Sequence, residues 1–213
     1  MYNNALSKYP VTFGDIWEST EGHRLYCGSC LDISLNNTYD LIYTDPPWNT
    51  RILNSFYSYA GVQTTYKFDR WISVFSKKIT DYLSDGTLFI EMGVSGNQTI
   101  INNFSNRLQL CSIIESKYGK STTMNITAWN RTGIINIPDV SSLKGMETAN
   151  ALISHFAVPN GLFLDPCAGE GYFLEMAIKA GSIVTGIELI KEKFASMLVK
   201  LSKYTKFERI NYG

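Results

Sequence analysis

Two short stretches carry the residues best suited to chemistry. Asp45-Pro46-Pro47-Trp48 follows the apolar run 41–43, and the stretch 165–171, Asp-Pro-Cys-Ala-Gly-Glu-Gly, follows the apolar run 162–164. Such runs are typical of buried strands, and open α/β sheets bind their ligands where the parallel strands end. We therefore expect both stretches at the ligand-binding edge of one sheet.

The second stretch has the features of a nucleoside-binding turn. Gly169 and Gly171 open a predicted helix, and glycine lets the backbone pass close to a ligand. Glu188 ends the next predicted strand, 17 residues beyond Gly171, where an acidic side chain can accept both hydroxyls of a ribose. Together these residues predict a nucleoside-containing cofactor, although G-x-G alone is also compatible with a helix start that needs small residues.

The first stretch is suited to an exocyclic amine on a flat base. Two successive prolines remove two backbone donors and stiffen the turn. If Asp45 and the Pro46 carbonyl accept the two amine hydrogens, the positive charge that develops as the nitrogen attacks is stabilised. Trp48 would stack on the base, a contact worth about 1–3 kcal/mol. The alternative is a Pro-Pro turn with a buried Trp and a capping Asp. The chemistry requires no metal.

On these motifs the chain resembles S-adenosylmethionine-dependent N6-adenine methyltransferases of the β arrangement, in which the catalytic Asp-Pro-Pro-Trp precedes the cofactor motif. The resemblance covers about residues 24–200 and implies a circularly permuted motif order. It implies a catalytic role for Asp45, Pro46, Pro47 and Trp48. It implies that S-adenosylmethionine binds at Asp165, Pro166, Cys167, Ala168, Gly169, Gly171 and Glu188.

The chain departs from the family pattern at three places. The family's Lys-Pro before the cofactor strand is Lys-Gly here, which makes Lys144 the candidate for the methionine carboxylate. Where the family often has an Asp that binds the cofactor adenine, this chain has Ser29, so Ser29 or Asp32 is the candidate there. Cys167 replaces the usual Phe and should still pack.

The stretch 49–67 is rich in Asn, Ser, Thr and Tyr and shows no strong period, so we expect a long loop. Such a loop could close over a base that has been flipped out of a duplex. The alternative is a solvated loop anchored to the core by its aromatic residues. The candidate substrate-binding residues are Asn49, Arg51, Tyr57, Tyr59 and Tyr66.

Strands alternate with helices along the chain, which predicts a Rossmann-like, doubly wound α/β domain spanning residues 1–213. Residues 1–23 lack a clear period and are expected to form an irregular arm. A mainly parallel sheet of seven strands is expected, with an antiparallel edge hairpin. Its strands are 24–27, 39–44, 87–92, 110–118, 122–129, 161–164 and 182–188. Helices are expected at 31–35, from Asp69 as N-cap to the Asp85-Gly86 turn, and at 97–108, 143–157, 170–180 and 190–204.

Composition limits how the chain could reach a polyanion. Lys plus Arg and Asp plus Glu number 19 each, so no net field attracts nucleic acid over long distances. Binding of nucleic acid through a local basic face or a basic partner remains possible. No apolar run is long enough for a membrane span, and the N-terminus does not resemble a targeting signal, which favours a cytoplasmic protein. Cys27-x-x-Cys30 could be redox-active or half a zinc site, but two ordinary thiols are favoured.

These expectations converge on a site-specific DNA adenine-N6 methyltransferase, with RNA as the other possible polymer. Only 93–142 could hold a target-recognition insert, and only a small one. Specificity is therefore expected to be low, or to come from a homodimer or a partner subunit. A non-catalytic methyltransferase-like subunit is the alternative from another class. A nicotinamide-dependent oxidoreductase would leave Asp-Pro-Pro-Trp unexplained.

Overall fold

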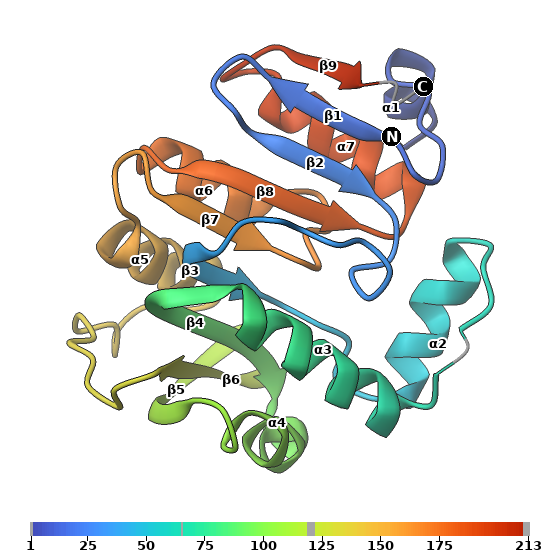
Figure 1. Ribbon diagram of the computed structural model, residues 1–213. Helices are drawn as coiled ribbons and strands as arrows, with labels where there is room; N and C mark the ends of the chain where they lie inside the picture. Colours follow the sequence, from blue (N-terminus) through green and yellow to red (C-terminus); the bar gives the residue numbers. More distant parts are fainter. Residues whose placement is uncertain (1, 65, 119–121, 211–213) are drawn as a thin grey trace.

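The computed structural model describes residues 2–64, 66–118 and 122–210. A single mixed sheet runs through the molecule in the order β5-β6-β4-β3-β7-β8-β2-β1-β9 (Figure 1). Its strands are β1 (Ile16–Ser19), β2 (Arg24–Cys27), β3 (Tyr39–Thr44), β4 (Leu83–Gly93), β5 (Gln109–Tyr118), β6 (Thr122–Asn130), β7 (Leu162–Asp165), β8 (Ile183–Glu188) and β9 (Phe207–Ile210).

The five central strands, β4, β3, β7, β8 and β2, are parallel to one another. Both edges are antiparallel, with β6 and β5 on one side and β1 and β9 on the other. The helices are α1 (Tyr2–Lys8), α2 (Thr50–Tyr59), α3 (Phe68–Tyr82), α4 (Asn97–Phe104), α5 (Met146–Phe156), α6 (Tyr172–Lys179) and α7 (Lys191–Leu201), and a short 3-10 helix η1 (Val94–Gly96) precedes α4.

Helices cover both faces of the sheet, so the doubly wound α/β class and the edge hairpin are confirmed. One core packs apolar residues of α1, α5, α6 and α7 against the sheet, and a second core on the other face packs α2, α3 and α4. Parallel strands covered on both faces must be apolar on both, which is why their sequences read as continuous apolar runs. The three residues of the predicted hairpin spacer, 119–121, lie outside the described residues.

The prediction of seven strands and an irregular arm over 1–23 was wrong. This segment contains α1 and β1, and β1 pairs antiparallel with β9 through Ser19 and Phe207. Each of the two strands has only four residues. Neither is long enough to show a period, and they pair with each other across most of the length of the sequence, while β1 also pairs with β2.

Two further local predictions were wrong. Thr50–Tyr59 forms a helix within the expected loop, with Leu53 and Tyr57 buried four residues apart and the Asn49 side chain accepting a hydrogen bond from the Ile52 amide. Residues 31–35 form no helix.

The start and end of α3 also differ from the prediction. Its N-cap is Lys67, and Asp69 lies in its first turn. Asp85-Gly86 lies inside β4. A Cβ at Gly86 would come within 1.7 Å of the Asp40 carbonyl oxygen, so this glycine permits the close approach of β3 and β4.

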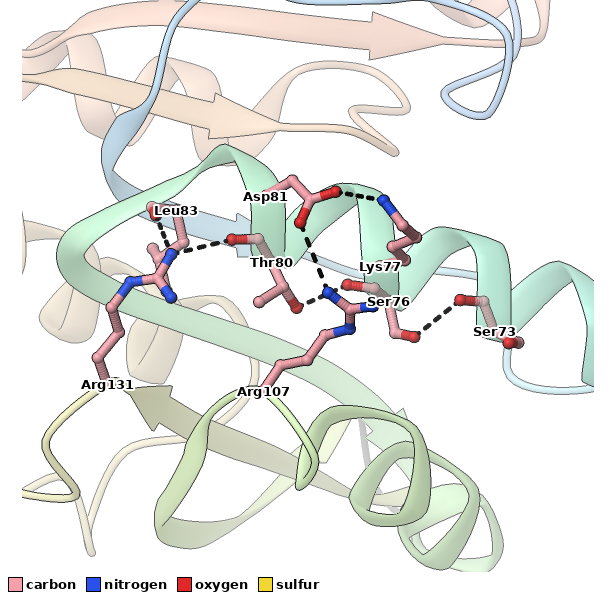
Figure 2. Close-up of polar contacts among 8 residues, drawn as sticks. All are labelled: Ser73, Ser76, Lys77, Thr80, Asp81, Leu83, Arg107 and Arg131. Carbon is pink, nitrogen blue, oxygen red and sulfur yellow. Dashed lines mark hydrogen bonds and ion pairs between the residues drawn. The ribbon is translucent and has the colours of Figure 1, made fainter.

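The carboxyl end of α3 is held by an arginine that follows β6 (Figure 2). The Arg131 guanidinium donates to the carbonyl oxygens of Thr80, Leu83 and Ser84 at 3.3, 2.8 and 3.2 Å. The Leu83 amide also donates to the Thr80 carbonyl, and Leu83 and Ser84 begin β4. The arginine therefore adds donors where the chain turns from α3 into β4.

None of the described helices is long and apolar enough to cross a membrane.

We predict that Arg131→Ala lowers the free energy of unfolding by roughly 1–2 kcal/mol, because it removes three hydrogen bonds to carbonyls where α3 turns into β4. Arg107→Ala is the matched control, since Arg107 makes an exposed ion pair with Asp81 at 3.6 Å. That variant should cost less than about 1 kcal/mol. Urea denaturation of both variants measures the difference, and equal losses would contradict the capping role.

Candidate active site

A cavity of about 200 Å³ opens where the central parallel strands end. Segments that follow β3, β7 and β8 meet there, as the predicted placement of both motifs requires. Side chains from α2 and α3 cover it from one side. Its lining includes Asp45, Pro47, Phe56, Tyr57, Trp71, Pro166, Cys167, Ala168, Gly169, Glu170, Glu188 and Lys193.

Asp45 is a half-buried residue that lines this cavity. The Trp48 indole Nε1 donates to Asp45 Oδ1 at 2.6 Å. The Trp48 ring packs against Gly93, where an added Cβ would lie 3.0 Å from Cε3. Pro46 is buried, and Pro47 lines the cavity. The motif therefore fixes the carboxyl group through its own tryptophan, a role that the sequence did not indicate.

The glycine turn after β7 leaves room for a ligand beside its backbone. Gly169 has φ +54°, and no atom lies within 4 Å of the place where its Cβ would be. Gly171 has φ +77°, and a Cβ there would lie 2.6 Å from Met197 Cγ on α7. The left-handed backbone favours glycine at both positions. Gly169 thus provides open space at the cavity, and Gly171 provides close packing of α6 on α7.

Glu188 braces this turn from the end of β8. Its Oε2 accepts the Gly169 amide at 2.7 Å and its Oε1 accepts the Ile190 amide at 2.7 Å. Burial raises the pKa of Glu188, while the Ile190 amide and Lys193 oppose the shift. Each carboxylate oxygen keeps a further lone pair, so the predicted acceptance of ribose hydroxyls stays compatible with this arrangement.

Asp165 lies at the end of β7, just before the glycine turn, and is fully buried. Its Oδ1 accepts the Cys167 amide at 3.1 Å, and its Oδ2 has no hydrogen-bond partner among the described residues. Burial raises its pKa well above the ordinary value. Cys30 and Cys167 both line the cavity. Burial raises the pKa of the Cys27 thiol to about 12, consistent with an unreactive structural residue in β2.

Lys193 is a cavity residue that sequence reasoning missed. It is the one cationic side chain in the lining of the described cavity, and its ammonium lies 5.0 Å from the centre of the Phe56 ring. Its charge lowers the pKa of both Asp45 and Glu188 against the effect of burial. The available signal was its position in the first turn of the helix that follows Glu188.

Four predicted cofactor residues are not in the cavity lining: Asp165 and Gly171, described above, and Ser29 and Lys144. Ser29 is buried at the end of β2, where its hydroxyl lies 3.3 Å from the Tyr57 hydroxyl and accepts the Leu31 amide at 3.2 Å. Its neighbour Cys30 lines the cavity instead. Lys144 is exposed and lines a separate hollow beside Lys117 on β5. The structure therefore does not bring Lys144 to the glycine turn. Met146, the first residue of α5, lines the cavity instead.

The predicted substrate residues divide between the cavity and the surface of α2. Tyr57 is buried and lines the cavity. Asn49 caps α2. Arg51 and Tyr59 are exposed on the same helix, and Tyr66 is half-buried beyond it. A helix in place of a loop puts Phe56 and Tyr57 at the cavity and leaves Arg51 outside it.

Crystal structures of DNA methyltransferases share this fold. M1.HpyAVI matches with a TM-score of 0.62 and 18% identity, covering 83% of this chain and 97% of that chain. TTHA0409, a putative DNA modification methylase from Thermus thermophilus, matches with a TM-score of 0.62 and 18% identity, over 85% and 94%. The cytosine-N4-specific PvuII DNA methyltransferase matches with a TM-score of 0.61 and 14% identity, over 87% and 89%.

No family model matches the sequence, and a search of curated proteins finds no match. At the identities above, the structural similarity establishes the fold, which is that of these DNA methyltransferases.

We predict that Trp48→Phe raises the pKa of Asp45 above its present value. Burial raises this pKa to about 6, and the Trp48 hydrogen bond opposes the rise by favouring the ionised form. Titration of the carboxyl carbon by NMR in the free protein measures the shift. Trp17→Phe is the control, since the Trp17 indole has no hydrogen-bond partner among the described residues and lies on β1. An unchanged Asp45 pKa in Trp48→Phe would contradict the positioning role of Trp48.

Proposed function

We propose that the protein is an S-adenosylmethionine-dependent methyltransferase that modifies the N6 amine of adenine, with DNA as the favoured polymer. The observation that carries this proposal is the single cavity lined by both motifs, with Asp45 and Pro47 on one side and Gly169 and Glu188 on the other. The fold supports it, since M1.HpyAVI and TTHA0409 have both been crystallised with S-adenosylmethionine.

The residues present fit this cofactor. Gly169 leaves open space beside its backbone, Glu188 offers acceptors for ribose hydroxyls, and the cavity wall is largely apolar as an adenine ring requires. The bound cofactor supplies an electrophilic methyl group on a cationic sulfur.

Asp45 and the Pro46 carbonyl would hold the substrate amine. The Asp45 carboxyl is anchored through Oδ1 by Trp48, which leaves its second oxygen to accept an amine hydrogen. An amine whose hydrogens are accepted can attack with less cost, because the developing positive charge is stabilised and the nitrogen is already oriented. Trp48 thus acts first through its hold on Asp45. Its predicted stacking on the base stays a prediction.

The same geometry would also accept the N4 amine of cytosine, the target of the PvuII enzyme that shares the fold. Adenine is favoured here because Trp48 after the two prolines resembles the motif of N6-adenine methyltransferases. Adenine in RNA is the other substrate to test. A non-catalytic role is disfavoured because the Asp and both prolines are present and the Asp faces the cavity. A homodimer or a partner subunit is proposed to supply target recognition.

We predict that Gly169→Ala weakens binding of S-adenosylmethionine at least about tenfold, because the new methyl group fills the open space beside the turn. The substitution also forces an L residue into a left-handed backbone, at roughly 1 kcal/mol. Gly61→Ala is the matched control, since Gly61 has φ +70° and equally open surroundings but follows α2 outside the cavity lining. Calorimetric titration of both variants with S-adenosylmethionine separates loss of ligand space from backbone strain. Equal affinities of the two variants for S-adenosylmethionine would contradict the cofactor site.

We predict that the native protein transfers labelled methyl groups from S-adenosylmethionine to adenine N6 and that Asp45→Ala reduces the rate by about 10²–10³-fold or more. Cofactor affinity should stay within a few-fold of native. Nucleoside analysis after incubation with DNA and with RNA identifies the product. Label in cytosine, or in neither polymer while the cofactor binds, would overturn the proposal. Loss of cofactor binding in the variant would show that Asp45 is misassigned.

A further inference from the structure

Glu91 is a fully buried carboxyl group in β4, behind the catalytic edge. The Tyr43 hydroxyl donates to its Oε1 at 2.7 Å. Its Oε2 is buried without a hydrogen-bond partner among the described residues. The Tyr43 ring packs on Phe173, which lines the cavity, at 4.5 Å between ring centres. A carboxyl group with an unpaired buried oxygen is costly unless it stays protonated or meets a cation.

The sheet register places Glu91 beside the catalytic aspartate. Thr44 of β3 pairs with Ile90 of β4, so the next residues along these parallel strands are Asp45 and Glu91. On the other side of β3, Ile42 pairs with Leu164 of β7, which puts Asp165 level with Tyr43. Asp45, Glu91 and Asp165 therefore converge at the ends of three adjacent strands.

This carboxyl cluster has little positive charge to balance it. The titratable groups that face Glu91 are Tyr43 on β3, Asp45 after β3 and Asp165 on β7. On the other neighbouring strand, β6, Glu91 pairs with Ile126, which is apolar. Lys193 faces Asp45 and Glu188 from α7. Among the described residues, no group of acidic, Cys and His side chains could hold a metal ion.

Burial and the neighbouring charge of Asp45 raise the pKa of Glu91 to about 8, and the Tyr43 hydrogen bond opposes this shift. The pKa values of Asp45 and Glu91 are both raised, and the Glu91 Oε2 is buried without a hydrogen-bond partner among the described residues, which together favour a protonated Glu91 beside Asp45 in the ligand-free site. A cation brought into the cavity beside Asp45 would favour the loss of that proton, because opposite charges interact strongly where water is excluded.

We propose that Glu91 is a positioning residue that keeps a proton beside Asp45, releases it when a cationic ligand enters the cavity, and thereby makes the site selective for a sulfonium over a neutral thioether. This inference rests on the proposed function and adds to it the way in which the enzyme distinguishes its cofactor from the demethylated product. The ligand class is an organic cation carried by a nucleoside.

The proton balance of the reaction agrees with this role. In the proposed reaction, the bond from sulfur to the methyl carbon would break as the bond from N6 to that carbon formed, so the positive charge would move from sulfur to nitrogen. The nitrogen would then lose one proton to Asp45, whose carboxyl group accepts an amine hydrogen in the proposed geometry. Asp45 and Glu91 would thus take back the proton released on cofactor binding, and the remaining thioether is neutral. The cavity then holds no ligand cation, which favours product release.

Calorimetric titration of the full-length protein with S-adenosylmethionine and with S-adenosylhomocysteine tests the proposal. Repeating each titration near neutral pH in buffers of different ionisation enthalpy gives the number of protons exchanged on binding. We expect the native protein to release several tenths of a proton more with S-adenosylmethionine than with S-adenosylhomocysteine. In Glu91→Gln this difference should fall to less than half, and the preference for the sulfonium should fall several-fold.

Two further variants keep the result interpretable. Glu147→Gln, an exposed change of the same type on α5, should leave the difference as in the native protein. Tyr43→Phe removes a hydrogen bond that favours the ionised form of Glu91, so it should move the proton release to higher pH. If Glu91→Gln does not fold, the pH profile of Tyr43→Phe tests the role of Glu91 in proton release.

An undiminished difference in Glu91→Gln, or an unmoved pH profile in Tyr43→Phe, would overturn the role of Glu91. Failure of either ligand to bind the native protein would instead overturn the proposed function.

Discussion

The parallel register of β4, β3, β7 and β8 is the constraint on which the rest of the structure depends. Strands that run in one direction end at one edge, so residues far apart in sequence arrive together there. Asp45, Glu91, Asp165 and Glu188 all lie at or just beyond the ends of these strands. The fold concentrates carboxyl groups at one edge and covers it with helices, which raises the pKa of each of them through burial.

Much of the hydrogen bonding at this edge is internal to the protein. Trp48 is bound to Asp45, and Glu188 is bound to the amides of Gly169 and Ile190. These contacts fix the Asp45 carboxyl group and the shape of the glycine turn without any ligand. Preorganisation of this kind lowers the cost of orienting polar groups during reaction, which is where much of the catalytic effect of an active site arises. Lone pairs on both carboxylates remain for ligands.

The sequence could predict those parts of the fold and site that depend on patterns among neighbouring residues. The runs before Asp45 and Asp165 are apolar on both sheet faces, so the strands and the motifs that end them were visible without long-range information. The pairing of β1 with β9 was not, because two four-residue strands carry no period of their own. Glu91 was hidden for a different reason: its place beside Asp45 comes from strand register, which no motif records.

The charge distribution links the site to its ligands. The chain has equal numbers of acidic and basic residues, yet the buried edge of the sheet has four carboxyl groups, of which Asp45 and Glu188 face Lys193. A polyanion gains nothing from such a cavity, so under the proposed function nucleic acid would be held by surface contacts and would enter only as a single base. A nucleoside cofactor with a positive sulfur would gain most from it. In our proposal for Glu91, the same excess of carboxyl groups favours the charged form of the cofactor over the neutral product.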